Sequence, residues 1–143
     1  MNPLRLTTAT QVFAVVTVTA TLAGGCGVLK RDAIAVWDLG GNSTLNADTT
    51  TFTALVTRLD CSSGVTGDVN DPDIELADDH VVITFTVSPS EAAVADCQGN
   101  DQVPYDVEIP EPLGSRELVD GACTSTEANS TVFCRPDGVR YAP

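Results

Sequence analysis

Apolar and polar residues alternate along two stretches of the chain. Residues 81–87 read Val-Val-Ile-Thr-Phe-Thr-Val, and residues 103–109 read Val-Pro-Tyr-Asp-Val-Glu-Ile. Successive side chains of a strand point to opposite faces of a sheet, so each stretch predicts a strand with one buried face. Pro104 has no N–H to donate to a ladder, so the second strand lies at a sheet edge or begins after that residue.

A β-rich segment, 52–59, and several shorter ones complete the pattern. The shorter candidates are 73–76, 116–119, 131–133 and 139–141. About seven short strands separated by Gly, Pro and Asn-Asp predict an all-β fold, a sandwich or a small barrel. Of the two we expect a small β-sandwich, with its domain at residues 47–143.

One short helix is predicted before Cys97. Ser88 is a capping residue, Pro89 suits the first helical position, and Glu91 follows three residues after the cap, so we expect one or two helical turns within 89–95. A strand, a helical turn and a cysteine in this order resemble part of an immunoglobulin domain, with Cys61 as the partner cysteine. We therefore expect an immunoglobulin-like topology without membership of that family, because no Trp lies between the two cysteines.

The N-terminal residues have the features of a signal peptide. Residues 1–11 carry one positive charge, Arg5, and residues 12–23 form an apolar run that three threonines interrupt. A membrane-spanning helix needs about 20 apolar residues, so this run is too short to span a bilayer. A charged region, an apolar region and small residues in sequence predict a signal peptide over residues 1–25.

The end of this segment, Leu22-Ala23-Gly24-Gly25-Cys26, resembles a bacterial lipobox. The resemblance implies cleavage before Cys26 and a diacylglycerol on its sulfur, although Ala23 stands where Leu is usual. The alternative is secretion, with cleavage after Ala20 or Ala23. Two or three acyl chains would hold the protein firmly, because each buried methylene contributes about 0.8 kcal/mol.

Four cysteines remain after Cys26, an even number that suits disulfides in an oxidising compartment. Four cysteines allow three pairings. Sequence order and the placement of the predicted strands favour Cys61 with Cys97 and Cys123 with Cys134.

Residues 26–46 are interpreted as a lipid-anchored N-terminal segment or tether. Within it, residues 33–37 read Ala-Ile-Ala-Val-Trp, an apolar patch that a polar tether would not contain. Either this patch is a first strand docked on the domain, or Trp37 sits at the level of the lipid headgroups.

The net charge of the chain is −13, from 20 acidic and 7 basic residues. Nucleic-acid binding depends on Lys and Arg, so this charge excludes a nucleic-acid partner. Removal of residues 1–25 takes away Arg5 and no acid, which leaves −14. Because the charge also repels anionic lipids, attachment to the membrane depends on the lipid anchor.

Acidic residues are concentrated between residues 68 and 80, and oxygen ligands at alternate positions are what Ca²⁺ requires. The segment lacks the glycine of an EF-hand loop, and turn formation explains Asn-Asp-Pro-Asp equally well. The weak candidates for metal ligands are Asp68, Asp71, Asp73 and Glu75. His80 has neither a second imidazole for zinc nor an evident nucleophile to activate.

Five blocks between residues 51 and 141 resemble uncharacterised exported lipoproteins of high-GC Gram-positive bacteria. The blocks are 58–67, 82–87, 97–100, 103–107 and 113–123. The resemblance implies an exported, disulfide-bonded domain and carries no activity. We therefore expect a non-enzymatic binding or envelope-associated module without a cofactor, held on the outer face of the cell membrane, whose partner is an envelope protein or a small ligand. The alternative is a secreted enzyme or accessory subunit with a weak metal site at 68–80.

Overall fold

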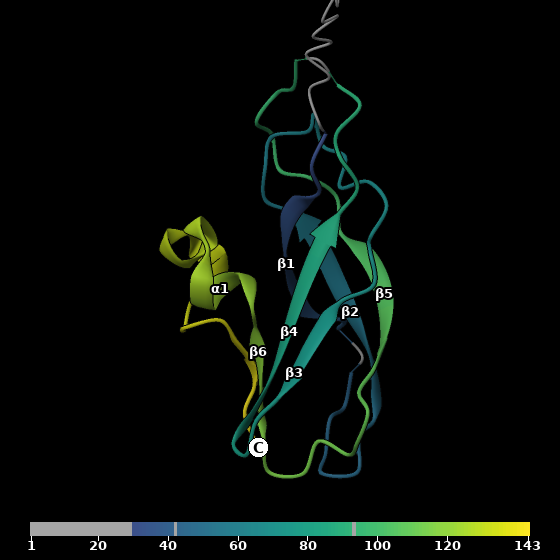
Figure 1. The fold of residues 1–143 in the computed structure, drawn as a ribbon, viewed down its shortest axis with the longest axis vertical. Coiled ribbons are helices and arrows are strands. Elements are labelled where there is room, and N and C mark those ends of the chain that lie inside the picture. The colour runs from purple at the N-terminus through teal and green to yellow at the C-terminus, as the bar shows by residue number, and fades with distance from the viewer. Residues whose placement is uncertain (1–29, 42, 93) are drawn as a thin grey trace, which may run out of the picture.

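The computed structural model describes residues 30–41, 43–92 and 94–143, and its architecture is mostly β (Figure 1). One mixed sheet contains all seven strands of this part of the chain. They are β1 (Ala33–Leu39), β2 (Thr51–Arg58), β3 (Asp73–Leu76), β4 (His80–Val87), β5 (Val103–Glu108), β6 (Glu117–Asp120) and β7 (Val139–Tyr141). The helical elements are α1 (Ala122–Ser125) and two 3₁₀ turns, η1 (Glu127–Ser130) and η2 (Val132–Cys134). An all-β fold with one short helix and two disulfides is confirmed.

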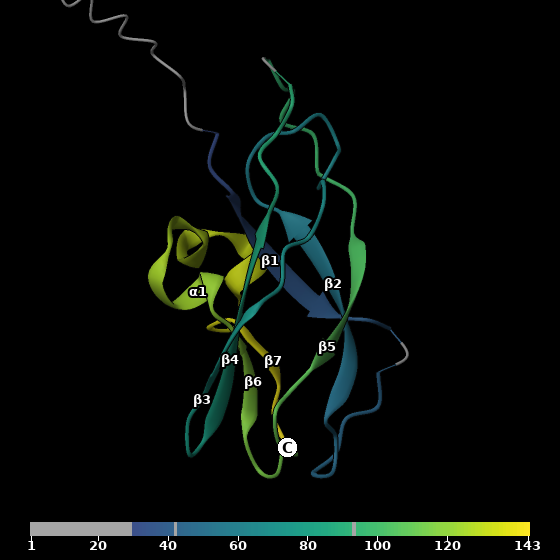
Figure 2. The ribbon, with the colours of Figure 1, turned by 45° about the vertical axis from the view of Figure 1, so that its right-hand side comes forward.

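The sheet folds over on itself to form a sandwich. Its strand order is β5-β2-β1-β4-β6-β7, with β3 on the other edge of β4. Strands β3 and β4 lie in front of β1 and β2 in Figure 1, with β6 to their left, and Figure 2 shows β5 beside β2. Strand β5 pairs only with β2, so the prediction of an edge strand at Pro104 is confirmed.

The main core lies between the two layers. Val81, Ile83, Phe85 and Val87 are fully buried, as the alternating sequence of β4 predicts. Trp37 lies across the layers, with its ring 5.7 Å from that of Phe52 in β2 and 6.4 Å from that of Phe85. Burial of such rings supplies a large share of the stability of a small core.

Strand β1 is covered on both faces. Ala33, Ala35 and Trp37 join the main core, whereas Ile34 and Val36 face a second cluster. The helical segment contributes four buried residues to this second cluster: Ala122, Cys123, Ala128 and Cys134. Two-sided burial explains why this strand is apolar without alternation.

These observations settle the interpretation of the patch 33–37. A first strand docked on the domain is confirmed, and the hypothesis that Trp37 sits among lipid headgroups is wrong, because its side chain is 1% exposed. The folded sheet therefore includes residues from within the 26–46 segment and begins before residue 47.

Both expected disulfides are present. Cys61 is bonded to Cys97, and Cys123 is bonded to Cys134. The first joins the loop after β2 to the loop after β4. The second closes the helical segment over the outer face of β1.

The helix predicted within 89–95 is wrong for the described residues of that stretch. The capping side chains bind a neighbouring loop instead: Ser88 Oγ accepts a hydrogen bond from the backbone N–H of Asp68 at 3.1 Å, and Ser90 Oγ lies 3.2 Å from Ser62 Oγ. The strand predicted at 131–133 is also wrong, because Val132–Cys134 forms a 3₁₀ turn. Cys134 forms a disulfide with Cys123, only 11 residues earlier, and this short loop favours a compact turn over an extended strand.

Candidate functional sites at the two ends of the sandwich

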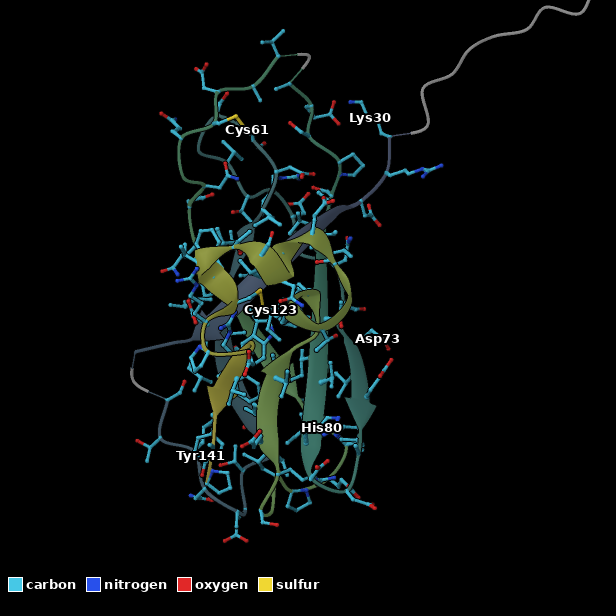
Figure 3. All side chains as sticks on the ribbon, turned by 90° about the vertical axis from the view of Figure 1, so that its left-hand side faces the viewer. Lys30, Cys61, Asp73, His80, Cys123 and Tyr141 are labelled. Carbon is cyan, nitrogen blue, oxygen red and sulfur yellow. A yellow bond between two sulfur atoms is a disulfide. The ribbon has the colours of Figure 1, made fainter. Side chains whose placement is uncertain are left out.

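The sandwich has two distinct ends, each formed by loops. Lys30 and Cys61 lie toward one end and His80 and Tyr141 toward the other (Figure 3). We call the first the disulfide-bonded end and define it as the loops 59–72 and 88–102. The second, the far end, consists of the β3–β4 turn, the loop 109–116 and the C-terminal residues.

The loops of the disulfide-bonded end are held together by more than the disulfide. The backbone N–H of Ser63 donates to the carbonyl of Asp96 at 3.0 Å, and the N–H of Asp101 donates to the carbonyl of Gly64 at 2.9 Å. Gly64 has a φ of +90°, which glycine adopts without strain. These bonds fix the two loops as one unit.

Arg58 organises the same end from the last position of β2. Its side chain is buried, and its guanidinium donates to the carbonyl oxygens of Thr66, at 3.0 Å, and of Ser88. The Asn100 amide donates to the carbonyl oxygens of Arg58 and Asp60 at 3.0 and 2.8 Å. Sequence analysis did not identify Arg58, because a single Arg at the end of a strand is usually exposed.

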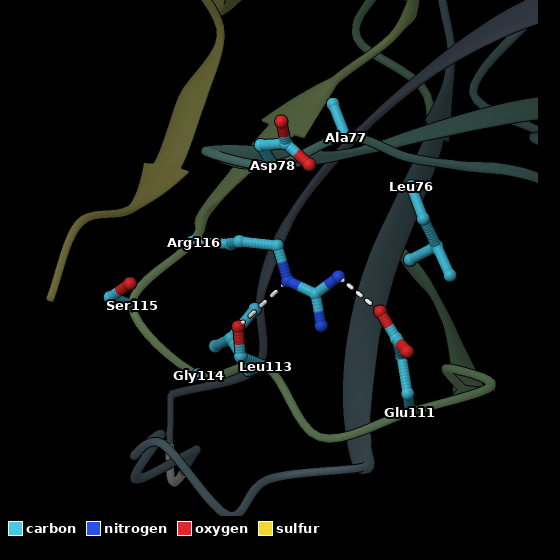
Figure 4. Close-up of a pocket in the computed structure, with 8 residues that line it drawn as sticks. All are labelled: Leu76, Ala77, Asp78, Glu111, Leu113, Gly114, Ser115 and Arg116. Atoms are coloured by element: carbon cyan, nitrogen blue, oxygen red, sulfur yellow. Dashed lines mark hydrogen bonds and ion pairs between the residues drawn. The ribbon is translucent and has the colours of Figure 1, made fainter.

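A shallow cavity of about 380 Å³ lies at the far end (Figure 4). Arg116 is its central cation: its Nε donates to the carbonyl of Leu113 at 3.0 Å, and its Nη1 lies 2.5 Å from Glu111 Oε1. Arg116 therefore forms an ion pair with a carboxylate of the loop that precedes it. Leu76 and Asp78 from the β3–β4 turn form the opposite wall.

His80 is at the far end, where its Nδ1 lies 2.6 Å from Asp79 Oδ1. Together with Ser115 and Glu117, His80 lines a second cavity at this end, also of about 380 Å³. Within the described part of the chain, the hydrogen-bond partner of the His80 ring is Asp79, and no hydrogen bond joins His80 to Ser115.

The acidic segment 68–80 is spread along one side of the sandwich. Asp71 accepts a hydrogen bond from the Tyr105 hydroxyl at 2.9 Å, which joins the loop before β3 to β5 and, with burial, raises the pKa of Tyr105. Asp73 and Glu75 are exposed on β3, and Asp68 lies in the loop tied to Ser88. Among the residues that the structure describes, no three His, Cys, Asp or Glu side chains are grouped as a metal site would require.

Asp120 is a buried carboxylate at the point where β1 diverges from β4 and β6 takes its place. Its oxygens accept from the backbone N–H groups of Trp37 and Ala122, each at 3.0 Å, and Arg140 Nη2 lies 2.8 Å away. Burial raises the pKa of Asp120, and the hydrogen bonds and Arg140 oppose that shift. No local sequence pattern indicates that Asp120 is bonded to Trp37, 83 residues earlier in the chain.

No family model, curated protein or solved structure matches this chain. Within the described ranges, no helix is long and apolar enough to cross a bilayer. Residues 1–29, which contain the predicted signal peptide and Cys26, lie outside the described residues.

Proposed function

We propose that this protein is a lipoprotein anchored through Cys26 to the outer face of the cell membrane, where it is a non-enzymatic binding or envelope-associated module. The observation that carries this proposal is the use of the cysteines. Four of the five are paired in disulfides, as suits an oxidising compartment, and Cys26 is the fifth. Its position directly after the small residues that follow the apolar run supports a lipid attachment point.

The same arrangement supports kinship with the exported lipoproteins of high-GC Gram-positive bacteria. The blocks 58–67 and 97–100, which carry that resemblance, form much of the disulfide-bonded end. A rigid end on a short anchor suits a module that presents its remaining surface to other molecules of the envelope.

The far end offers the surface for such a partner. Its cavity combines the Arg116–Glu111 pair with Leu76, which is 41% exposed. Mixed polar and apolar lining of this kind fits a small ligand or a loop of an envelope protein.

Expression of the full chain in a high-GC Gram-positive host tests the proposal. We expect the wild type to incorporate labelled palmitate and to partition into the detergent phase. The matched variant Cys26→Ser keeps all four disulfide cysteines, so it should fold, lose the label and appear in the medium. A wild type that remains unlabelled and partitions into the aqueous phase would refute lipid anchoring and favour secretion.

A further inference from the structure

We propose that the disulfide-bonded end rests on the surface of the phospholipid bilayer and that the far end, with the Arg116 cavity, projects away from it. This inference rests on the proposed lipid anchor at Cys26 and adds an orientation to it. The bilayer contact is made by exposed apolar side chains of the loops 59–72 and 88–102.

The length of the connecting chain limits the distance of this end from the membrane. Four residue steps separate Cys26 from Lys30, and an extended chain spans at most about 3.6 Å per residue, so the connection reaches about 14 Å. Lys30 lies toward the disulfide-bonded end (Figure 3), where its Nζ is 2.8 Å from a carboxylate oxygen of Glu91 in the loop 88–102. A lipid on Cys26 therefore brings this end close to the headgroups.

Two of the three most exposed large apolar side chains among the described residues lie at this end. Val94, in the loop 88–102, is 89% exposed, and Val65, in the loop 59–72, is 56% exposed. Phe133, in η2, lines a cavity together with Cys61 and Cys97. Such side chains gain free energy when a lipid surface removes them from water, at about 25 cal/mol per Å² of apolar area.

The loops that carry Val65 and Val94 are already fixed before they meet a membrane. The Cys61–Cys97 disulfide joins them, and the backbone bond from Ser63 to Asp96 runs beside it. Contact with the bilayer therefore costs little conformational entropy.

Acidic residues affect both possible contacts with the membrane, end-on and flat. The exposed side of β3 and β5 carries acidic residues that anionic headgroups would repel. These residues are Asp73, Glu75, Asp106 and Glu108. The disulfide-bonded end also carries exposed acids, so charge does not select this end; the short connection to Cys26 and the exposed valines do. Contact therefore stays at the headgroup level and is weakened by anionic lipid. The acids of this end are Asp60, Asp68, Asp71, Glu91, Asp96 and Asp101.

Tryptophan quenching in vesicles tests this orientation. The protein bearing its lipid is purified from membranes and reconstituted in phosphatidylcholine vesicles that contain a headgroup-labelled nitroxide lipid. Val94→Trp and Val65→Trp report on the disulfide-bonded end, and Ser115→Trp is the matched control at the far end; all three replaced residues are exposed. The buried Trp37 contributes background emission, which is measured with the wild-type protein.

We expect the introduced tryptophan to lose much of its emission at position 94 and at position 65, and to keep its emission at position 115. Replacement of phosphatidylcholine by phosphatidylglycerol should reduce the loss at the first two positions. Equal quenching at the two ends of a lipid-bearing protein would overturn the orientation while leaving the anchor intact. A purified protein whose mass lacks the diacylglycerol would overturn the anchor, and the orientation with it.

Discussion

The Asp120 carboxylate accepts a hydrogen bond at 3.0 Å from the backbone N–H of Trp37, 83 residues earlier in the chain. At this point β1 separates from β4, and the N–H of Trp37 loses a partner in the sheet. The carboxylate replaces that partner. The indole Nε1 of the same Trp37 donates to the carbonyl of Ile83 at 3.0 Å, so the junction of β1, β4 and β6 is held by both ends of one residue.

Replacement of this carboxylate should destabilise the fold strongly. Asp120→Ala leaves the N–H of Trp37 without its acceptor and Arg140 without its buried partner, and removal of one member of a buried pair costs about 3–5 kcal/mol. Urea unfolding measures the loss. The control is Asp38→Ala, which removes an exposed carboxylate 3.6 Å from the same guanidinium and should cost less than about 1 kcal/mol. Equal losses in the two variants would contradict a special role for Asp120.

The raised pKa of Asp120 has a predictable consequence for stability. A carboxyl whose pKa is higher in the folded than in the unfolded state binds its proton more tightly when folded, so its contribution is present at low pH and is lost as pH rises through the folded pKa. The free energy of unfolding of the wild type minus that of Asp120→Asn should therefore fall as pH rises above the unfolded pKa of about 4. Unfolding in urea across this range measures it. A difference that grows with pH would mean that the pairing with Arg140 outweighs burial.

The hydrogen bond between Tyr105 and Asp71 should be visible in an alkaline titration. The carboxylate accepts a hydrogen bond from the phenol, and this bond, burial and the negative charge of Asp71 raise the pKa of Tyr105. Asp71→Asn should lower the ionisation midpoint of one of the two tyrosines, measured by tyrosinate absorbance. Asp73→Asn removes an equally exposed charge from the same segment and serves as the control. An unchanged midpoint in Asp71→Asn would show that the bond is not formed in solution.

Gly121 is required because the side chain of Thr84 lies too close to its Cα for a Cβ to fit, and not because of an unusual backbone angle. A Cβ at this position would lie 1.9 Å from Thr84 Oγ1, so Gly121→Ala should destabilise the protein by about 1–3 kcal/mol or more. Removal of the hydroxyl in Gly121→Ala/Thr84→Ala should recover part of the loss, as a double-mutant cycle would record. Gly99→Ala, with no atom within 4 Å of the new Cβ, should be nearly neutral. Additive losses in the cycle would contradict the proposed clash.

The elements that the sequence predicted correctly are those whose signal is local. Strand β4 alternates strictly because one of its faces is buried, and Pro104 marks an edge whatever the rest of the fold does. Strand β1 was ambiguous, because the second face that it buries is covered by a segment about 90 residues away, and no window around Trp37 contains that information.

The errors have the same origin. Ser88 and Ser90 have side chains that could cap a helix, but both form hydrogen bonds with the adjacent loop instead. The acidic segment was considered as one possible site, yet the fold directs Asp71 to Tyr105 and leaves Asp73 in water. Asp120 and Arg58 went unnoticed because their partners lie in other elements and their burial is a property of the assembled sandwich.

The central position of β1 also bears on whether the domain could be released from a membrane to which, as proposed, Cys26 attaches it. Only six residues, 27–32, lie between Cys26 and the first residue of this strand. A protease requires an extended and accessible segment, and a cut within the strand would remove a central part of the sheet. Release by cleavage would therefore destroy the fold unless the protease cut within those six residues. A protein anchored at Cys26 therefore has only this short segment at which it can be released intact.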